Sequence, residues 1–246
     1  MTTIVETIPT EELEHLPAEP LLAWAAAAFP SRIAVAASFG AEDVVIIDML
    51  SRVAPAVRVF TLDTGRLPAE TYAVMEAVRA RYGLAVDVLF PRTEAVEAMV
   101  RERGMNLFYR SVEDRKRCCQ VRKVEPLGRA LAGFDAWITG LRRDPAGSRT
   151  AVRKVEAESG RPGRVKVNPL ADWTWEQVWA YVREHDVPHS ALHAQGYPSI
   201  GCAPCTRAVA PGEDLRAGRW WWEDAAAHKE CGLHVTDADR VAGRPS

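Results

Sequence analysis

The stretch RIAVAASFGAEDVVIIDMLSR, residues 32–52, decides the fold. Its run Arg32–Ala37 (RIAVAA), apolar after the arginine, is typical of a buried strand, and Glu42–Arg52 has the apolar spacing of an amphipathic helix. The alternation continues with strands predicted at Val57–Leu62, Leu84–Phe90 and Ala136–Thr139, and helices at Pro68–Tyr82, Thr93–Arg103 and Val121–Leu131. Strands and helices that alternate across short turns predict an α/β fold, a parallel sheet with right-handed crossovers and helices on both faces.

Three polar or glycine-containing segments directly follow predicted strands. They are residues 38–43 (SFGAED), 62–65 (LDTG) and 139–143 (TGLRR). Because ligands of parallel sheets bind at the carboxyl ends of the strands, we expect these segments to share a pocket.

The helix and strand pattern weakens after Pro145. The segment Ala146–Val165 is polar and rich in Gly, Arg and Ser, which predicts a loop. Thr174–His185 is a predicted helix with Thr174 as its cap. From Val187 onward the chain has little periodicity, and this irregular C-terminal segment holds three of the five cysteines.

Composition excludes several classes of protein. The chain has 246 residues, 48% of them hydrophobic, so it can bury a full core without disulfides. Its first residues lack the basic and apolar regions of a secretory signal, and the apolar run Leu21–Phe29 is too short to span a bilayer. The net charge of −2 favours neither nucleic acid nor an anionic membrane. We therefore expect a cytoplasmic protein with reduced thiols.

The cysteines fall into three clusters. Cys118 and Cys119 are adjacent, Cys202 and Cys205 form a Cys-x-x-Cys pair, and Cys231 stands alone. Two pairs of thiolates can bind one zinc ion or one 4Fe–4S cluster. An adjacent pair is unusual for zinc, so the spacing favours 4Fe–4S. Adjacent cysteines on a helix point about 100° apart, and both can reach one centre if they lie at a helix start.

The remaining thiol has the surroundings of a nucleophile. Cys231 lies between Lys229 and His234 in a polar segment, and nearby cations favour the reactive thiolate. A buried inert cysteine is the alternative, but the polar neighbours do not suit a core strand.

Cations accompany the cysteine pairs. Lys123 follows Cys119 by one helical turn, and Arg216 and Arg219 are three residues apart, a spacing that suits paired contacts to a phosphate or sulfate. The basic run Arg115–Lys123 has a solvated helix face as its alternative interpretation.

Five motifs occur in order along the chain: CCQVRKVEPL (118–127), KVNPLADWT (166–174), GYPSIGCAPCTR (196–207), GRWWWE (218–223) and KECGLH (229–234). Together they resemble the assimilatory adenylyl-sulfate reductases of the phosphoadenylyl-sulfate reductase family. The resemblance runs from about Ser31 to His234.

The resemblance implies an adenine-nucleotide-α-hydrolase-like fold in three parts: an N-terminal helical segment (1–30), a nucleotide-binding α/β domain with the iron–sulfur site (31–210) and a catalytic tail (211–246). It implies reduction of adenylyl sulfate to sulfite and AMP in sulfate assimilation. Cys231 would hold an S-sulfocysteine that thioredoxin resolves. Reduction of the 3′-phosphorylated nucleotide, or of both, is the alternative.

The resemblance also assigns site residues. One 4Fe–4S cluster would be held by Cys118, Cys119, Cys202 and Cys205. Substrate would be bound by Ser38, Leu62, Thr64, Lys123, Gly140, Arg149, Arg216, Arg219 and His234. The loop that contains Arg149 reads DPAGSR (144–149), without the Asp-Gln-Ser stretch of many relatives.

Two other classes share parts of this pattern. An ATP-pyrophosphatase-type enzyme requires a Ser-Gly-Gly-x-Asp-Ser loop, and residues 38–43 lack its second glycine and its final serine. A non-enzymatic metal sensor would leave the strand-end segments without a role. The sequence leaves open whether the chain forms a homo-oligomer.

Overall fold

The computed structural model describes residues 8–143, 150–158, 163–224 and 232–233. The chain forms two compact units. The first contains Met1–Thr61, Ala69–Asp87 and Gly133–Ala191, and the second contains Leu62–Pro68, Val88–Ala132 and Leu192–Ser246. The predicted three-part division stays a prediction, since much of its last part lies outside the described residues.

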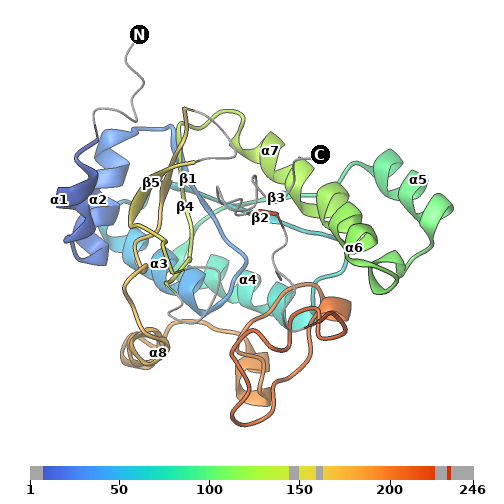
Figure 1. Ribbon diagram of the computed structural model, residues 1–246. Helices are drawn as coiled ribbons and strands as arrows, with labels where there is room; N and C mark the ends of the chain where they lie inside the picture. The colour runs from blue at the N-terminus through green and yellow to red at the C-terminus, as the bar shows by residue number, and fades with distance from the viewer. Residues whose placement is uncertain (1–7, 144–149, 159–162, 225–231, 234–246) are drawn as a thin grey trace. The chain divides into compact units, whose positions relative to one another are not determined.

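A six-stranded sheet has the order β3-β2-β1-β4-β6-β5 (Figure 1). Its strands are β1 (Ile33–Ala36), β2 (Arg58–Leu62), β3 (Val86–Leu89), β4 (Ala136–Ile138), β5 (Val155–Ala157) and β6 (Val165–Val167). The central strand β1 pairs in parallel with β2 and β4, and β4 pairs in parallel with β6. The predicted α/β fold with a parallel sheet is confirmed.

The edge strand β5 departs from the prediction. It pairs antiparallel with β6, with Val155 opposite Val167. The prediction that Ala146–Val165 is entirely a loop was therefore wrong. Each of these two strands has only three residues, too few for a periodic pattern, and each is defined by its partner's hydrogen bonds rather than by local sequence.

Helices α3 (Ala41–Val53) and α8 (Trp175–Glu184) show how the sequence determines the helices of the first unit and their packing. Nine residues of α3 are buried, and this helix packs against α2, α4 and α8. Helix α8 begins with the capping box of Thr174 and Gln177, which confirms the predicted start. The other helices of this unit are α1 (Thr10–Glu14), α2 (Ala18–Ala28) and α4 (Ala69–Tyr82).

The second unit contains helices on either side of the first cysteine pair. They are α5 (Thr93–Arg103), α6 (Val112–Cys119) and α7 (Glu125–Leu131). The unit also contains 3₁₀ turns at Leu107–Tyr109 and Ala203–Cys205. A further 3₁₀ turn, Ala191–Gln195, begins at the last residue of the first unit. In the described part of the chain, no helix combines the length and apolar character needed to cross a membrane.

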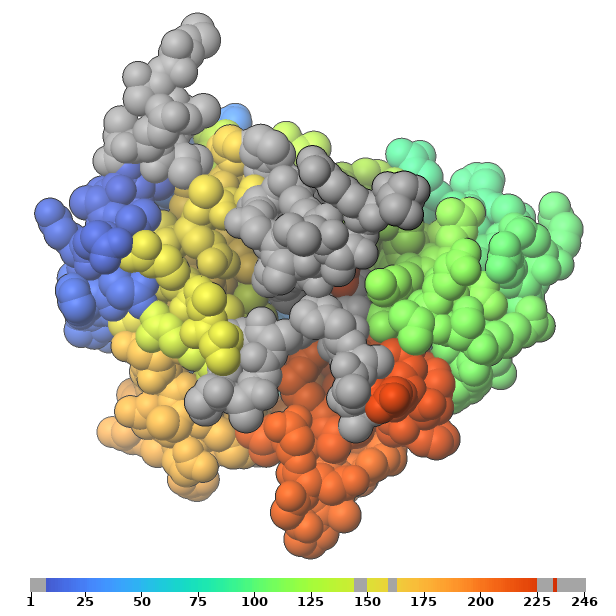
Figure 2. Space-filling model, viewed as in Figure 1, coloured from blue at the N-terminus to red at the C-terminus, as the bar shows by residue number. Residues whose placement is uncertain are grey.

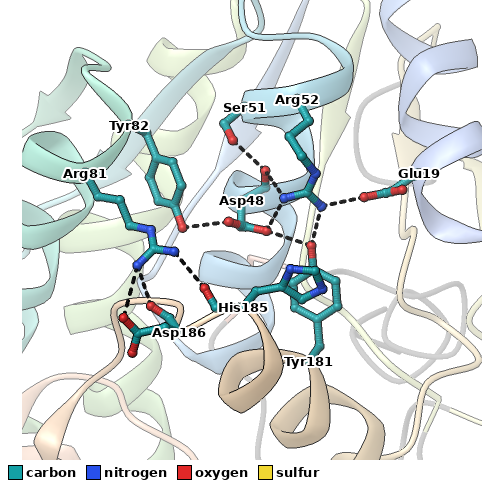
Figure 3. A network of polar contacts seen from close by, with 9 residues as sticks. All are labelled: Glu19, Asp48, Ser51, Arg52, Arg81, Tyr82, Tyr181, His185 and Asp186. Carbon is teal, nitrogen blue, oxygen red and sulfur yellow. Dashed lines mark hydrogen bonds and ion pairs between the residues drawn. The ribbon is translucent and has the colours of Figure 1, made fainter.

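A buried carboxylate on α3 joins four helices of the first unit (Figure 3). Asp48 accepts hydrogen bonds from Arg52 (2.5 Å), from the Tyr82 hydroxyl (2.9 Å) and from the Tyr181 hydroxyl (2.6 Å). Arg52 also pairs with Glu19 of α2 at 2.5 Å. Burial opposes ionisation of Asp48, but these donors prevail and hold its pKa below the usual value.

Asp48→Asn is expected to lower the free energy of unfolding at pH 7 by about 2 kcal/mol, because it removes the buried carboxylate that accepts hydrogen bonds from Arg52 and from two tyrosine hydroxyls. The folded pKa lies below the unfolded value of about 3.9, so the contribution is present above that pH and is lost as pH falls through the folded pKa. The free energy of unfolding, measured by urea titration, should differ less between pH 7 and pH 3 in the variant than in the wild type.

Asp87→Asn is the matched control for this experiment. Asp87 pairs with Arg58 at 2.5 Å, but its side chain is 48% exposed, so its loss should change stability by less than about 1 kcal/mol. Equal losses in the two variants would contradict the role given to Asp48.

Candidate functional site

In the first unit, the turn after β1 is organised by the first residues of α3. The backbone N–H and hydroxyl of Ser38 donate to Asp43 Oδ2 at 2.5 and 2.8 Å. Burial raises the pKa of Asp43 to about 6, although the hydrogen bonds from Ser38 oppose the rise. The side chain of Ser38, a predicted nucleotide contact, is thus oriented by a buried carboxyl group.

The turn after β4 approaches the same residues closely. A Cβ added to Gly140 would lie 2.5 Å from Asp43 Oδ1 and 2.9 Å from Glu42 Cβ. Two residues later, Arg142 donates through Nε to Glu42 at 2.7 Å. The turns that follow β1 and β4 therefore pack together, as expected for neighbouring parallel strands.

Gly140→Ala is expected to cost about 1–3 kcal/mol of stability, because a methyl group would overlap the Asp43 carboxyl and displace the turn. Its affinity for AMP should also fall, as measured by calorimetry. Gly133→Ala is the matched control, since no atom lies within 4 Å of its added Cβ. Unchanged stability and AMP affinity in Gly140→Ala would show that the close approach has no consequence.

In the second unit, the adjacent cysteines lie at the end of a helix. Cys118 and Cys119 are the last residues of α6, and the π-helical turn Gln120–Val124 follows. The two cysteines therefore do not lie at the helix start that the sequence analysis considered, because Ser111 caps α6 seven residues before Cys118 by accepting from the Asp114 N–H. A π turn changes the direction of side chains along a helix and is frequent at functional sites.

The four clustered cysteines meet around one cavity. Cys118, Cys119, Cys202 and Cys205 are all buried free thiols. With them, the cavity is lined by Phe108, Arg115, Arg122, Lys123, Arg219 and Trp220. Among the described residues, no group of three or more His, Cys, Asp or Glu side chains is arranged around a single metal ion.

Several polar atoms around this cavity have no hydrogen-bond partner. They are Arg122 Nε, Arg219 Nε and Trp220 Nε1, all buried. Buried N–H groups are normally paired, so these donors suit an acceptor that the protein does not supply. The inorganic sulfides and thiolates of an iron–sulfur cluster are such acceptors, and the four cysteine thiols are suitable ligands for the cluster.

The turn after β2 is attached to both cysteine segments. Thr64 Oγ1 lies 3.2 Å from Cys202 Sγ, and Arg122 Nη1 donates to the Thr64 carbonyl at 2.6 Å. Gly65, the residue after Thr64, has a φ of 71°, which glycine adopts without strain. The side chain of Thr64, predicted to bind nucleotide, therefore contacts a cysteine of the cavity.

Two arginines of the cavity wall contact the ring of Trp220. The guanidinium carbons of Arg115 and Arg219 lie 4.6 and 4.8 Å from its ring centroid. Arg115 is fully buried and forms an ion pair with Glu223 at 2.8 Å. Trp220 thus makes a cation–π contact with each of two arginines of the cavity wall.

Two glycines of the quoted motifs allow neighbouring groups to approach the backbone closely, which the motifs alone did not predict. A Cβ on Gly201 would lie 2.3 Å from the Arg219 guanidinium, and one on Gly218 would lie 2.2 Å from the Arg207 carbonyl oxygen. Gly218 permits the antiparallel bridge between Thr206 and Arg219. These glycines let the segment after Cys205 place Arg219 against the cavity.

Burial sets the protonation of the thiols. It raises the pKa of Cys118, with Arg122 opposing the rise, and raises that of Cys205 to about 12, with an added rise from Cys202. Without a bound cation these thiols are neutral at pH 7, and metal binding must therefore release protons.

The structure brings together part of the predicted site. Lys123 and Arg219 line the cavity with the four cysteines, whereas Arg216 is not among its described lining residues. Leu62 ends β2, two residues before Thr64. Arg149, Cys231 and His234 lie outside the described residues. Sequence reasoning missed Arg122, Gly201 and Glu223 as parts of the site, although the quoted motifs contain them.

Comparison with known proteins identifies the family. The phosphoadenosine phosphosulfate reductase domain matches residues 32–208. The chain is 51% identical to adenosine 5′-phosphosulfate reductase of Burkholderia cepacia over 83% of this chain and 81% of that protein. It is 48% identical to the reductase of the same name from Allochromatium vinosum, over 93% of this chain and 87% of that protein.

Solved structures agree with this result. Phosphoadenylyl-sulfate reductase from Candida auris, in a phosphate complex, superposes with a TM-score of 0.70 at 32% identity, over 80% of this chain and 94% of that chain. Yeast FAD synthetase, at 14% identity and a TM-score of 0.54 over 85% of this chain and 69% of that chain, shares the fold alone. The chain belongs to the phosphoadenosine phosphosulfate reductase family.

Proposed function

We propose that this protein reduces adenylyl sulfate to sulfite and AMP. The observation that carries the proposal is the cavity of the second unit, in which four buried free cysteines meet Lys123 and Arg219. Relatives of about this length and about half identical in sequence bear the name of that reductase. Reduction of an activated sulfate through a covalent intermediate uses cations that bind the anion and a thiol that attacks the sulfur.

We propose that Cys118, Cys119, Cys202 and Cys205 hold one 4Fe–4S cluster. Their burial and shared cavity, together with the unpaired donors Arg122 Nε and Arg219 Nε, support this assignment. Four thiolates add negative charge, which the cationic side chains of the wall offset. When bound, the cluster would supply a fixed charge and a covalent anchor for the two cysteine segments.

Lys123 and Arg219 are proposed to bind the phosphosulfate end of the substrate. Arg219 is 7% exposed and donates through Nη1 to Ser199 Oγ and the Ile200 carbonyl at 3.3 Å, both long contacts that leave its Nε unpaired. A planar guanidinium held in this way is oriented before an anion arrives. Arg216, Arg149 and His234 are proposed to complete this end of the site.

Ser38 and Gly140 of the first unit are proposed to contact the nucleotide, and the same role for Leu62 and Thr64 stays a prediction from the sequence. In parallel sheets the carboxyl ends of strands bind ligands, and all four residues end or follow a strand. The orientation of Ser38 by Asp43 and the close packing at Gly140 support a preformed turn.

The covalent step is assigned to Cys231. Its thiolate would attack the sulfur of adenylyl sulfate, forming an S–S bond while the bridging S–O bond breaks and AMP leaves with that oxygen. A thioredoxin thiol would then attack the Cys231 sulfur and release sulfite. The second thioredoxin thiol would resolve the mixed disulfide, so the dithiol supplies both electrons. A cytoplasmic location stays a prediction from the reduced thiols.

A comparison of the two sulfonucleotides tests the proposal. Anaerobically purified protein with thioredoxin and its reductase should form sulfite from adenylyl sulfate, with kcat/KM for the 3′-phosphorylated nucleotide lower by about 100-fold, because a phosphate that loses water without gaining a matching cation costs free energy. Equal rates would support dual specificity, and a preference for the 3′-phosphorylated form would support the alternative. Absence of sulfite with both nucleotides would reject the reductase.

A further inference from the structure

Glu14 contacts both sides of the segment that begins after β4. It is the last residue of α1, and one carboxylate oxygen accepts from Arg143 Nη2. The other oxygen accepts from the backbone N–H of Lys154 at 3.0 Å. A single carboxylate therefore joins residue 143 to residue 154, which are eleven positions apart in the chain.

Other contacts of the N-terminal segment act at the same place. The ammonium group of Lys154, a side chain only 3% exposed, donates to the Leu16 carbonyl at 2.6 Å and pairs with Asp172 at 2.7 Å. Arg143 donates through Nε to the Val152 carbonyl at 2.7 Å. Helix α1 packs against β5, and Figure 2 shows the blue N-terminal helices beside the yellow segment of that strand.

A fully buried side chain holds the same two backbone segments nearer the sheet. Asn168, fully buried, accepts from the Thr139 hydroxyl at 2.6 Å and donates to the Arg153 carbonyl at 2.7 Å. The Thr139 hydroxyl in turn accepts from the Leu141 N–H at 3.3 Å. Asn168 thus joins the two segments at Thr139 and Arg153, and Glu14 joins them at Arg143 and Lys154.

This arrangement has a consequence for the turn that carries Gly140. Asn168 holds that turn on its strand side through Thr139, and Glu14 holds it at Arg143. Between these points Arg142 donates to Glu42, two residues after the Ser38–Gly40 turn. Loss of the outer contact would remove one restraint on Arg143, whose backbone N–H also donates to the Ala171 carbonyl at 2.8 Å, and would loosen the position of Arg142 and Gly140.

We propose that Glu14 is a positioning residue for nucleotide binding, acting through Arg143 on the turn Gly140–Arg143; this inference rests on the proposed function. Glu14 lies before residue 32, where the family match begins. Segments before the reductase domain would therefore contribute to substrate affinity without touching the substrate.

Glu14→Gln tests the proposal in the full-length protein. The amide retains one acceptor oxygen and replaces the other with an amino group, so one side of the bridge is lost with little change in shape. We expect KM for adenylyl sulfate and Kd for AMP to rise about 5- to 10-fold, with kcat within twofold of the wild-type value. This pattern is expected when an interaction that stabilises the bound substrate and the transition state equally is lost. Amide exchange at Arg143 and Lys154, resolved with overlapping peptides, should accelerate by a similar factor.

Glu11→Gln is the matched control. Glu11 lies on the same helix and pairs with Arg153 at 2.7 Å, but its side chain is 83% exposed and it has no contact to Arg143. This variant should leave KM, Kd and exchange unchanged. A double-mutant cycle of Glu14→Gln with Arg143→Gln should show non-additive effects on KM, because the two act as one unit.

The inference would be overturned by unchanged KM and exchange in Glu14→Gln, by equal effects in Glu11→Gln, or by additive effects in the cycle. A general loss of folding in Glu14→Gln, with kcat reduced as much as kcat/KM, would also do so by showing a structural role alone. Failure of the proposed function would appear instead as no sulfite formation by the wild type, while the exchange and AMP measurements would still report on Glu14.

Discussion

The Cys231→Ser variant is expected to lose sulfite formation by on the order of 10⁴-fold or more, as removal of a covalent nucleophile does in other enzymes. Nucleophilic catalysis divides the displacement at sulfur into two steps, and serine at neutral pH lacks the thiolate that begins the first. The variant should still bind AMP and retain its iron, because Cys231 is separate in sequence from the two cysteine pairs.

The intermediate can be trapped by withholding the reductant. Wild-type enzyme incubated with adenylyl sulfate alone should release about one AMP per site and gain a sulfite group on the peptide that contains Cys231. Thioredoxin should remove that mass, and Cys231→Ser should never acquire it. Asp239→Asn, a change in the same terminal segment, is the control and should turn over normally. An adduct on another cysteine would refute the assignment of the nucleophile.

Cys205→Ser has the second large expected effect, the loss of the cluster. Wild-type protein purified without oxygen should be brown and contain iron and acid-labile sulfide in near-equal amounts, and the variant should contain neither. Cys118, Cys202 and Cys205 belong to the small buried core of the second unit, with Phe108 and Trp220. Because metal binding is coupled to folding in such sites, we expect most of the variant protein to be insoluble.

Cys231→Ser is the matched control for this experiment, since it is the same substitution outside the proposed ligand set. It should keep the visible absorption of the wild type. Zinc in stoichiometric amount without sulfide in the wild-type protein would reject the cluster. A Cys205→Ser protein that kept its iron and sulfide would reject that ligand.

Local sequence was sufficient for the elements that have enough residues to repeat a pattern. Helix α3 is apolar over most of its length, and the strand before it is an uninterrupted apolar run, so their order and type follow from periodicity. The strand ends, and with them Ser38 and Gly140, follow from the same pattern. By contrast, β5 and β6 are too short to be recognised alone, and β5 forms because β6 supplies hydrogen bonds at that edge.

The sequence by itself determined which chemical groups this protein possesses: two thiol pairs, one separate thiol and the cations of the ordered motifs. Only the tertiary structure decided which of them meet. In the basic run before and after Cys118, Arg115 and Arg122 are buried at the cavity while Lys116 and Arg117 face solvent. Adjacent residues in a helix point in different directions, so the fold around them selects which charge is desolvated, and the sequence spacing does not.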